Sequence, residues 1–384
     1  MGALYEQVKI DPSKKNFNRT MNLLTRSKRQ LESVVLQLSP MCNFNCGMCY
    51  AKMTAQEIHQ SGNHIRSFDE WKPYIDAIAD MDVYSIGLTG GECTMHPDFL
   101  KIYSYAYDKG LEIGVLTNGS LISDEMISLW KEKPPVSVSM TIYGATPEKY
   151  KEICKNEDGF YHVINNIMKL KNNGIKMILK STVIKENYDD ILEIDRFCRS
   201  IEEELKITTD IEQYDNCSSE SFTKHSLSLR NGESIQLLLY ADQTGKTYDE
   251  IYSIREKSIY TLGAQYRPIE RIDKFGSPCS AGTNSCYINW LGLMQPCVTF
   301  DLFSKDPKDT GFKKCWEDLV EWTNNIPRLT ECVNCLHRYR CRHCIAMHYN
   351  DTGELGKVSP RLCWKHNNPE EAERLENIYR DNNE

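Results

Sequence analysis

Six short β-rich runs alternate with amphipathic stretches in the first part of this 384-residue chain. The runs occupy residues 34–39, 84–89, 112–118, 136–143, 176–183 and 206–213. Segments with helical periodicity separate them, at residues 68–81, 97–109, 122–132, 159–173 and 187–204. Consecutive β/α units build a parallel sheet, and six units are fewer than the eight that close a full barrel. We therefore expect an α/β fold that is either doubly wound or barrel-like.

Polar side chains follow one face of two of these runs. Ser137, Ser139 and Thr141 share a face of one run, and Lys180 and Thr182 share a face of the next. Parallel strands that are covered on both faces are normally apolar throughout, and a buried polar row is costly without a polar partner. We expect these faces to line a lumen that holds a cofactor. The alternative is that both strands are edge strands facing water.

The chain contains sixteen cysteines, and eleven of them are clustered. The clustered residues are Cys42, Cys46, Cys49, Cys279, Cys286, Cys297, Cys332, Cys335, Cys341, Cys344 and Cys363. With no signal peptide and no run of 18 apolar residues, we expect a cytoplasmic protein. Thiols stay reduced there, so clustered cysteines indicate metal ligands or catalysts rather than disulfides. The remaining five are expected to be small buried residues.

The net charge of −8 bears on the choice of partner. Nucleic-acid backbones and anionic membranes both attract basic surfaces. We therefore expect neither nucleic acid nor a membrane to be a main partner of this chain.

Cys42, Cys46 and Cys49 form a C-x3-C-x2-C motif directly after the first run. Parallel β/α folds bind ligands at this edge of the sheet. Three thiolates can hold three irons of a [4Fe–4S] cluster and leave the fourth iron open to a non-protein ligand. The alternative is a Cys3His zinc site completed by His59 or His64.

A Gly-Gly-Glu motif, Gly90, Gly91 and Glu92, follows the second run. Paired glycines allow backbone to approach a ligand closely, and the Glu92 carboxylate could grip an ammonium group.

The two motifs in this order resemble those of radical S-adenosylmethionine (SAM) enzymes. The resemblance implies a partial, TIM-like (β/α)6 barrel. It implies that the open iron chelates the methionine moiety of SAM, and that the reduced cluster cleaves SAM to a 5′-deoxyadenosyl radical, which abstracts a hydrogen atom from substrate. Residues implied to contact SAM are Met48, Tyr50, Gly90, Gly91, Glu92, Asn118, Ser139, Thr141 and Lys180. Cys93 is either a hydrogen-atom donor or, as we favour, a buried core residue.

The C-terminal cysteines resemble the SPASM domain, which holds two auxiliary [4Fe–4S] clusters in some radical SAM enzymes. The resemblance implies that Cys279, Cys297 and Cys344 ligate an inner cluster. It assigns the outer cluster to Cys332, Cys335, Cys341 and Cys363, although Cys341 and Cys344 are separated by two residues where the usual pattern has three. A zinc-ribbon domain is the alternative.

Cys286 is the natural fourth ligand of the inner cluster. If Cys286 does not ligate, that cluster has an open iron, or Cys286 is a free thiol that could donate hydrogen.

We expect five segments along the chain. They are an extended N-terminal arm or capping strand (1–33), the radical SAM partial barrel (34–213), a linker with helices near 231–241 and 247–258 (214–275), an irregular Cys-rich SPASM domain (276–367) and a C-terminal helix (368–384).

These features together predict a radical SAM/SPASM oxidoreductase with three [4Fe–4S] clusters. The expected substrate is a ribosomally made peptide, which would be oxidised or cross-linked through a thioether or carbon–carbon bond. The expected electron donor is a flavodoxin or ferredoxin. The alternatives are a sugar or cyclitol dehydrogenase or epimerase and a non-catalytic metal-binding scaffold.

Overall fold

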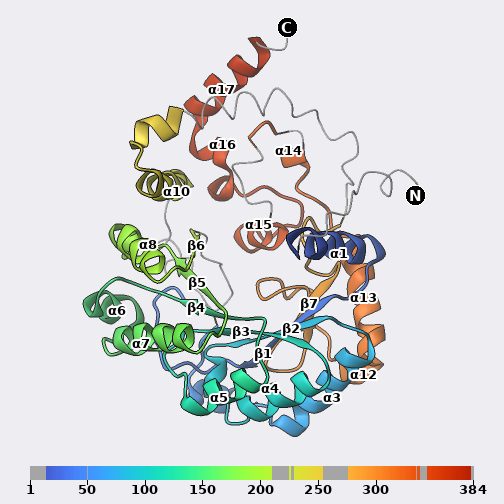
Figure 1. The fold of residues 1–384 in the computed structure, drawn as a ribbon. Helices are drawn as coiled ribbons and strands as arrows, with labels where there is room; N and C mark the ends of the chain where they lie inside the picture. Colours follow the sequence, from blue (N-terminus) through green and yellow to red (C-terminus); the bar gives the residue numbers. More distant parts are fainter. Residues whose placement is uncertain are drawn as a thin grey trace.

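A single eight-stranded sheet organises the chain (Figure 1). The computed structural model describes residues 14–49, 51–209, 225, 229–253, 276–333, 335–337 and 344–381. The strand order is β6-β5-β4-β3-β2-β1-β7-β8. The strands are β1 (Ser33–Ser39), β2 (Ser85–Gly90), β3 (Glu112–Thr117), β4 (Ser137–Thr141), β5 (Met177–Thr182), β6 (Leu205–Thr208), β7 (Ser285–Ile288) and β8 (Met294–Gln295). Neighbours from β6 to β7 are parallel, and β8 is antiparallel to β7. The six predicted β/α units are confirmed, and the sheet stays open because β6 and β8 are its edges.

Helices follow the strands, five of them where the amphipathic segments predicted them. In the barrel they are α2 (Ala55–Gln60), α3 (Phe68–Asp80), α4 (Phe99–Asp108), α5 (Asp124–Glu132), α6 (Pro147–Cys154), α7 (Gly159–Asn172) and α8 (Ile191–Ser200). Polar caps start several of them. Ser67 and Glu70, for example, form a capping box at the start of α3, which satisfies backbone N–H groups that the helix leaves unpaired.

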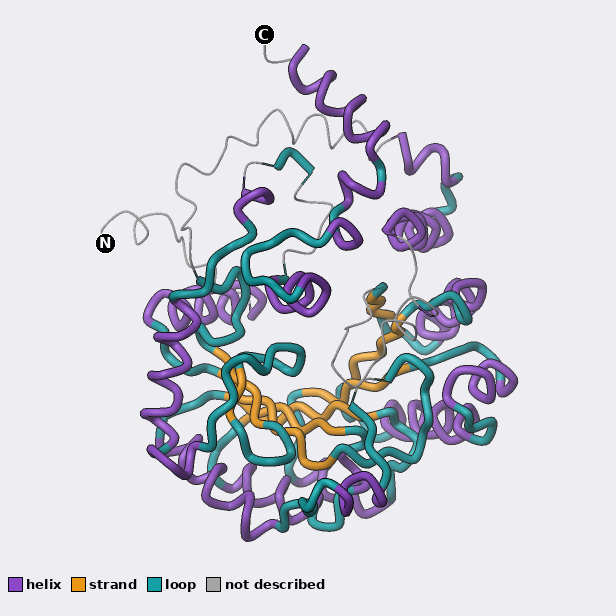
Figure 2. Tube along the Cα trace, turned by 180° about the vertical axis from the view of Figure 1, so that it is seen from behind, coloured by secondary structure: helices purple, strands orange, loops and turns teal. Residues whose placement is uncertain are grey.

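Further helices lie in the described part of the C-terminal half. It contains α10 (Leu229–Thr244), α12 (Pro307–Thr310), α13 (Phe312–Asn324), α14 (Thr330–Val333), α15 (Ile345–Thr352), α16 (Trp364–Asn367) and α17 (Pro369–Asp381). The helices predicted near 231–241 and 369–381 are therefore confirmed. The helix predicted over 247–258 is present at residues 248–253, and its remainder lies outside the described residues. Two opposite views place α14, α16 and α17 far from α3–α5 (Figure 1, Figure 2).

The apolar face of the sheet forms the core with the helices that pack on it. Its side chains alternate along each strand and are 0–2% exposed: Val34, Leu36, Ile86, Leu88, Ile113, Val115, Val138, Met140 and Leu179. Burial of this face supplies most of the hydrophobic stabilisation of the barrel.

The opposite, inner face is polar and partly open. Strand register puts Leu116 beside Ser139 and Thr141 beside Lys180 on this face. Leu116 is 39% exposed although β3 is an interior strand, so side chains do not fill the space in front of it. Because β4 and β5 also have neighbours on both sides, the alternative of water-facing edge strands is wrong.

The sheet continues beyond the expected end of the barrel. β7 pairs with β1, with Val34 opposite Cys286. Residues 276–367 are therefore not wholly irregular, as we had expected, because their first strands extend the barrel sheet. The sequence did not indicate this, since a four-residue strand carries too short a pattern to be recognised.

The N-terminal segment is a helix rather than an extended arm or strand. Helix α1 (Lys14–Lys28) is held to residues 276–284 by polar contacts. Arg26 donates to the carbonyls of Pro278 and Cys279 at 3.1 and 3.2 Å. The buried Asn284 amide donates to Thr25. Long-range polar contacts of this kind leave no periodic apolar signal in the sequence.

No helix in the described part of the chain is long and apolar enough to cross a membrane.

Two glycines at the end of β2 allow close contact with the end of β1. A Cβ atom on Gly90 would lie 2.4 Å from the Ser39 carbonyl oxygen, and one on Gly91 would lie 2.4 Å from that of Met41. The contact is completed by backbone hydrogen bonds from Gly91 to Ser39 at 2.8 Å and from Glu92 to Met41 at 2.7 Å. The glycines therefore fix the position at which the chain leaves β1.

We predict that Gly91→Ala destabilises the protein by about 1–3 kcal/mol, the usual effect of overpacking, because the new methyl group would collide with backbone. Gly114→Ala is the matched control, since its Cβ would meet only the Ile86 carbonyl oxygen at 3.9 Å. Thermal unfolding of both variants should show a lower midpoint for Gly91→Ala alone. Equal midpoints would contradict the steric argument.

Candidate functional site

The three cysteines of the first motif lie together on the loop after β1. Cys42, Cys46 and Cys49 are half-buried and are electrostatic neighbours of one another. The described residues include no group of three or more His, Cys, Asp or Glu side chains arranged to hold a single metal ion. A zinc–sulfur bond of about 2.3 Å brings the sulfurs of a zinc site close together. In a [4Fe–4S] cluster each thiolate binds a different iron, so the ligands are spaced more widely.

The two histidines suggested for a zinc site are both exposed. His64 is 73% exposed and pairs with Glu70 at 2.9 Å, and His59 is exposed on α2. Of the two, His64 already has Glu70 as its partner.

Hydrogen-bond donors reach the first of the three sulfurs. The Cys42 sulfur accepts from the Phe44 backbone N–H at 3.4 Å and from the Asn118 amide at 3.7 Å. Backbone N–H groups near Cys49 oppose the rise that burial causes in its pKa. Thiolates bind iron, and donors of this kind stabilise them. The residues present therefore fit a thiolate-ligated cluster.

Two side chains serve the third sulfur. Cys154, at the end of α6, is the main cause that lowers the pKa of Cys46, and the Tyr143 phenol lowers it further. Burial raises the pKa of Cys42 to about 12 and also raises that of Cys49. Cys154 had been expected to be only a small buried residue.

An aromatic side chain of the cysteine loop packs against the barrel and holds the loop in place. Phe44 is 1% exposed and makes edge-on contacts with Tyr143 and Tyr150, at centroid distances of 6.0 and 6.3 Å. Gly159 leaves the space for this ring, since a Cβ there would lie 2.7 Å from it. Buried aromatic pairs add specific packing to area burial, so the loop has a defined position without secondary structure.

The Glu92 carboxylate is occupied by this chain's own groups. It is 0% exposed and accepts from the Thr94 backbone and hydroxyl, the Thr117 hydroxyl and the Asn118 backbone at 2.6–3.1 Å. Burial raises the pKa of Glu92, and these donors oppose that rise. The expected grip of the Glu92 side chain on an ammonium group is therefore not what the structure shows. Instead, the carboxylate ties β2 to the end of β3.

Asn118 turns towards the cysteine loop, as expected of an inward-facing residue. Its amide nitrogen donates to Asn43 at 2.8 Å, and its amide oxygen accepts from Ser120. Together with its contact to Cys42, these hydrogen bonds indicate that Asn118 orients the loop.

The remaining residues expected to contact SAM differ in how far their side chains are buried. Ser139, Thr141 and Lys180 are half-buried on the inner face. Burial, with a contribution from neighbouring Lys206, lowers the pKa of Lys180. Met48 is 8% exposed and packs into the core. Tyr50 lies outside the described residues.

Cys93 is a buried core residue, which is the reading we favoured. Its side chain is 0% exposed, and its thiol donates to the Leu116 carbonyl at 3.2 Å. A thiol in this position has no access to the inner face, which argues against its role as a hydrogen-atom donor.

Three cysteines of the second domain also come together. Cys279 and Cys344 are electrostatic neighbours of Cys297. Ser277 and Thr299 hydroxyls lie 3.3 Å from the Cys279 and Cys297 sulfurs. This is the set implied for the inner auxiliary cluster.

The structure does not bring Cys286 to this group. Cys286 lies in β7 opposite Val34 and is 2% exposed within the apolar core. Residues paired in a parallel register point to the same face, so Cys286 points away from the inner face. Its thiol neighbour is Cys315 rather than Cys279 or Cys297. This placement corrects the expectation that Cys286 is a fourth ligand or a hydrogen donor.

The iron content of two cysteine variants tests this correction. We predict that Cys286→Ala retains the iron of the reconstituted parent protein, because its thiol lies in the core. Cys297→Ala should hold about four irons fewer per chain, the content of one [4Fe–4S] cluster. Iron and sulfide assays after anaerobic reconstitution measure both. An equal loss from Cys286→Ala would restore it as a ligand.

The outer cysteines gather near the C-terminus. Cys335 and Cys363 are both electrostatic neighbours of Lys365, and the Cys335 backbone donates to Cys332 at 3.3 Å. His337 is buried against Trp364, with ring centroids 5.0 Å apart. Cys341 lies outside the described residues. The outer cluster remains a proposal.

A histidine that sequence reasoning missed lies over the first cysteine motif. His225 is bonded to Glu186 at 2.5 Å, and its ring is so close to Gly47 that a Cβ there would lie 2.8 Å from Nε2. Nothing in the sequence between residues 214 and 275 marked this position.

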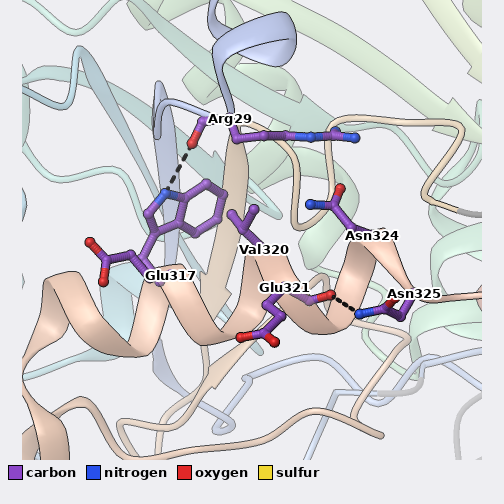
Figure 3. Close-up of a pocket in the computed structure, with 7 residues that line it drawn as sticks. Arg29, Glu317, Val320, Glu321, Asn324 and Asn325 are labelled. Atoms are coloured by element: carbon purple, nitrogen blue, oxygen red, sulfur yellow. Dashed lines mark hydrogen bonds between the residues drawn. The ribbon is translucent and has the colours of Figure 1, made fainter.

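A groove beside α13 contains none of the predicted site residues. Arg29, Trp316, Glu317, Val320, Glu321, Asn324 and Asn325 line it (Figure 3). The Trp316 indole donates to the Arg29 carbonyl at 3.3 Å. With no thiol in its lining, the groove does not contribute to the cysteine sites.

One family model matches the part of the chain that carries the cysteine motif. Residues 36–198 match the model of the Radical SAM superfamily. This range runs from β1 to α8 and includes both the cysteine motif and the Gly-Gly-Glu motif.

Relatives extend the similarity over most of the chain. The AdoMet-dependent heme synthase of Nitratidesulfovibrio vulgaris is 24% identical over 359 residues, which cover 86% of this chain and 92% of that protein. The antilisterial bacteriocin subtilosin biosynthesis protein AlbA of Bacillus subtilis is 21% identical over 306 residues, 76% of this chain and 59% of AlbA.

Solved structures share the fold. SuiB of Streptococcus suis bound to S-adenosylmethionine has a TM-score of 0.64 at 15% identity and covers 91% of this chain and 82% of its own. SuiB has also been solved with its precursor peptide SuiA.

Proposed function

We propose that this chain, which carries a radical SAM domain at residues 36–198, is a SPASM-type radical SAM oxidoreductase that modifies a peptide. The observation that carries the proposal is the loop at the end of β1, in which three neighbouring cysteines lie together and donors reach the Cys42 sulfur. When bound, the cluster and SAM supply an organic radical that can take a hydrogen atom from an unactivated C–H bond.

The chain's own residues would bind and orient. Cys42, Cys46 and Cys49 would hold the cluster. Asn118 would keep the loop in place, and the inner-face residues Ser139, Thr141 and Lys180 would face the ribose and carboxylate of SAM, as the family resemblance implies. The two glycines of the Gly-Gly-Glu motif expose backbone beside the loop. Such positioning is what a protein contributes to cofactor chemistry.

The inner and outer cysteine groups are suited to a reaction that oxidises the substrate. An oxidised or cross-linked product forms when the substrate gives up one hydrogen atom and then a proton and an electron. That electron needs an acceptor. We assign the inner and outer cysteine groups the task of holding auxiliary clusters that receive it and pass it to an external flavodoxin- or ferredoxin-type protein.

Two similarities support a peptide substrate. AlbA is named for the biosynthesis of a bacteriocin, and SuiB has been solved with a precursor peptide.

A haem precursor is the second candidate. The AdoMet-dependent heme synthase matches this chain along almost its whole length. Strand register also puts Lys206 beside Lys180 on the inner face, where two neighbouring cations would suit an anionic substrate. By contrast, an epimerase that uses a thiol hydrogen donor has less support, because Cys93 and Cys286 are both buried in the core. A non-catalytic metal-binding scaffold would not account for the open inner face of the sheet.

We predict that Cys42→Ala, Cys46→Ala and Cys49→Ala each abolish reductive SAM cleavage. Replacing Cys332 and Cys335 should spare cleavage and reduce substrate turnover, because these residues would serve only the outer cluster. The measurement is 5′-deoxyadenosine formed under anaerobic conditions with dithionite, and Cys198→Ala is the buried-cysteine control. Cleavage that survives loss of the first motif would rule out the proposed function.

We predict that the reconstituted protein oxidises a short peptide encoded beside its gene. The assay compares this peptide with a haem precursor by mass spectrometry, alongside 5′-deoxyadenosine. Conversion of the haem precursor alone would replace the peptide assignment with the second candidate. If neither substrate raises 5′-deoxyadenosine above the background without substrate, both assignments fail.

A further inference from the structure

Two glycines lie side by side on the inner face of the sheet. Gly87 of β2 and Gly114 of β3 are partners in the parallel register. Because Gly114 precedes Leu116 by two residues, both glycines share the face of Leu116. A glycine inside a strand weakens it, and it often marks a bulge, a sharp bend, or a place where a ligand or another backbone comes close.

The backbone does not require a glycine at either position. Neither residue has a positive φ, and the β2–β3 pairing runs from Ser85 to Leu88 without a register shift. A Cβ on Gly87 would lie 3.4 Å or more from its neighbours, all of them side-chain atoms. One on Gly114 would meet only the Ile86 carbonyl oxygen within 4 Å, at 3.9 Å. Both positions therefore have room for a side chain.

The fold accounts for the other glycines that the structure describes outside α10. Each of them either has a positive φ or would bring an added Cβ to 2.8 Å or less from another atom. Gly87 and Gly114 are the exceptions, and they are neighbours. Since there is no bulge, bend or close backbone here, a ligand is the remaining reason for glycine in these strands.

The surroundings of the two glycines indicate the kind of group that binds. Val35 is the register partner of Gly87 on β1, and the 39% exposed Leu116 comes next on the same face of β3. Neighbouring strands lie about 4.8 Å apart, so the two glycines form a flat patch of bare backbone beside two apolar side chains. A flat ring contacts such a patch with its whole face, whereas a branched aliphatic chain touches it with a few carbons.

This glycine patch, Gly87 and Gly114, adjoins the proposed SAM site. Gly114 pairs with Ser137 on β4, two residues before Ser139, which is proposed to face the ribose of SAM. Two residues of a strand span about 7 Å. The glycine patch therefore continues the proposed SAM site towards the amino ends of the strands, where a substrate would lie next to the cofactor.

We propose that Gly87 and Gly114 are specificity-determining residues that accommodate an aromatic side chain of the peptide substrate beside Leu116. The inference deepens the proposed function and rests on it, because it names the substrate group that the inner face accepts. A side chain at either position would occupy the space of the ring.

The test measures binding to the full-length protein, reconstituted anaerobically and supplied with SAM. The probes are N-acetyl-phenylalanine amide and N-acetyl-leucine amide, and saturation-transfer NMR gives the dissociation constant of each. The variants are Gly87→Ala, Gly114→Ala and Gly114→Val, which fill the glycine patch by degrees. Thr208→Leu is the matched control, because it adds bulk to the same face on the edge strand β6.

We expect the parent protein to bind the phenylalanine amide several-fold more tightly than the leucine amide. Gly87→Ala and Gly114→Ala should each weaken the phenylalanine amide several-fold. Gly114→Val should weaken it by about tenfold or more, the usual effect of misfit by a methylene group or two in an apolar site. Thr208→Leu should leave both dissociation constants at the parent values.

Equal affinities of the parent for the two amides, or an unchanged affinity in Gly114→Val, would overturn the inference and leave the proposed function intact. A parallel loss of SAM binding in Gly114→Val, measured by equilibrium dialysis, would also overturn it, since the ring on the patch would then be the adenine of SAM. A parent protein that holds no iron and forms no 5′-deoxyadenosine with dithionite would instead refute the proposed function. If Gly114→Val fails to fold, the two alanine variants decide the result.

Discussion

The backbone of Gly90–Glu92 lies directly on the backbone of Ser39–Met41, and the position of the cysteine loop depends on this contact. A loop that carries a cluster has no strand pairing of its own. Here, β2 fixes its start through two backbone hydrogen bonds, and the Glu92 carboxylate links that point to the end of β3. Burial of a carboxylate is costly unless donors surround it, and four donors do so. The Gly-Gly-Glu motif therefore fixes the position of the cysteine loop before any ligand binds.

Local periodicity made much of this fold predictable, whereas long-range contacts did not. Alternating runs located the six barrel strands, and the period-two pattern in β4 identified its inner face. The SPASM resemblance groups Cys279 with Cys297, and the two are electrostatic neighbours in the structure. Spacing could not show which face of a strand a cysteine occupies, so Cys286 was assigned to the wrong side. The polar contacts that hold α1 to Asn284 and the approach of Cys154 to Cys46 join residues far apart in sequence. Neither leaves a pattern that a single chain displays.

Structural thiols and candidate ligand thiols lie in different places relative to the sheet. Cys286 and Cys93 lie among apolar side chains, where a thiol serves as a small hydrophobic group. Cys42, Cys46 and Cys49 lie beyond the end of β1, where the Phe44 backbone and the Asn118 amide donate to the Cys42 sulfur. The number of cysteines in the chain is thus a poor guide to the number of ligands. Donors around each sulfur are the better criterion.

The arrangement of β1 and β7 bears on the kind of substrate. The cysteine loop follows the carboxyl end of β1, whereas Cys279 precedes the amino end of the parallel strand β7. The antiparallel β8 leads towards that same end, and Cys297 follows it. The two cysteine groups are therefore separated along the strand direction by about the length of β1. Seven residues span roughly 20 Å at the usual rise of a strand. A molecule that contacted both regions at once would therefore have to be about as long as β1.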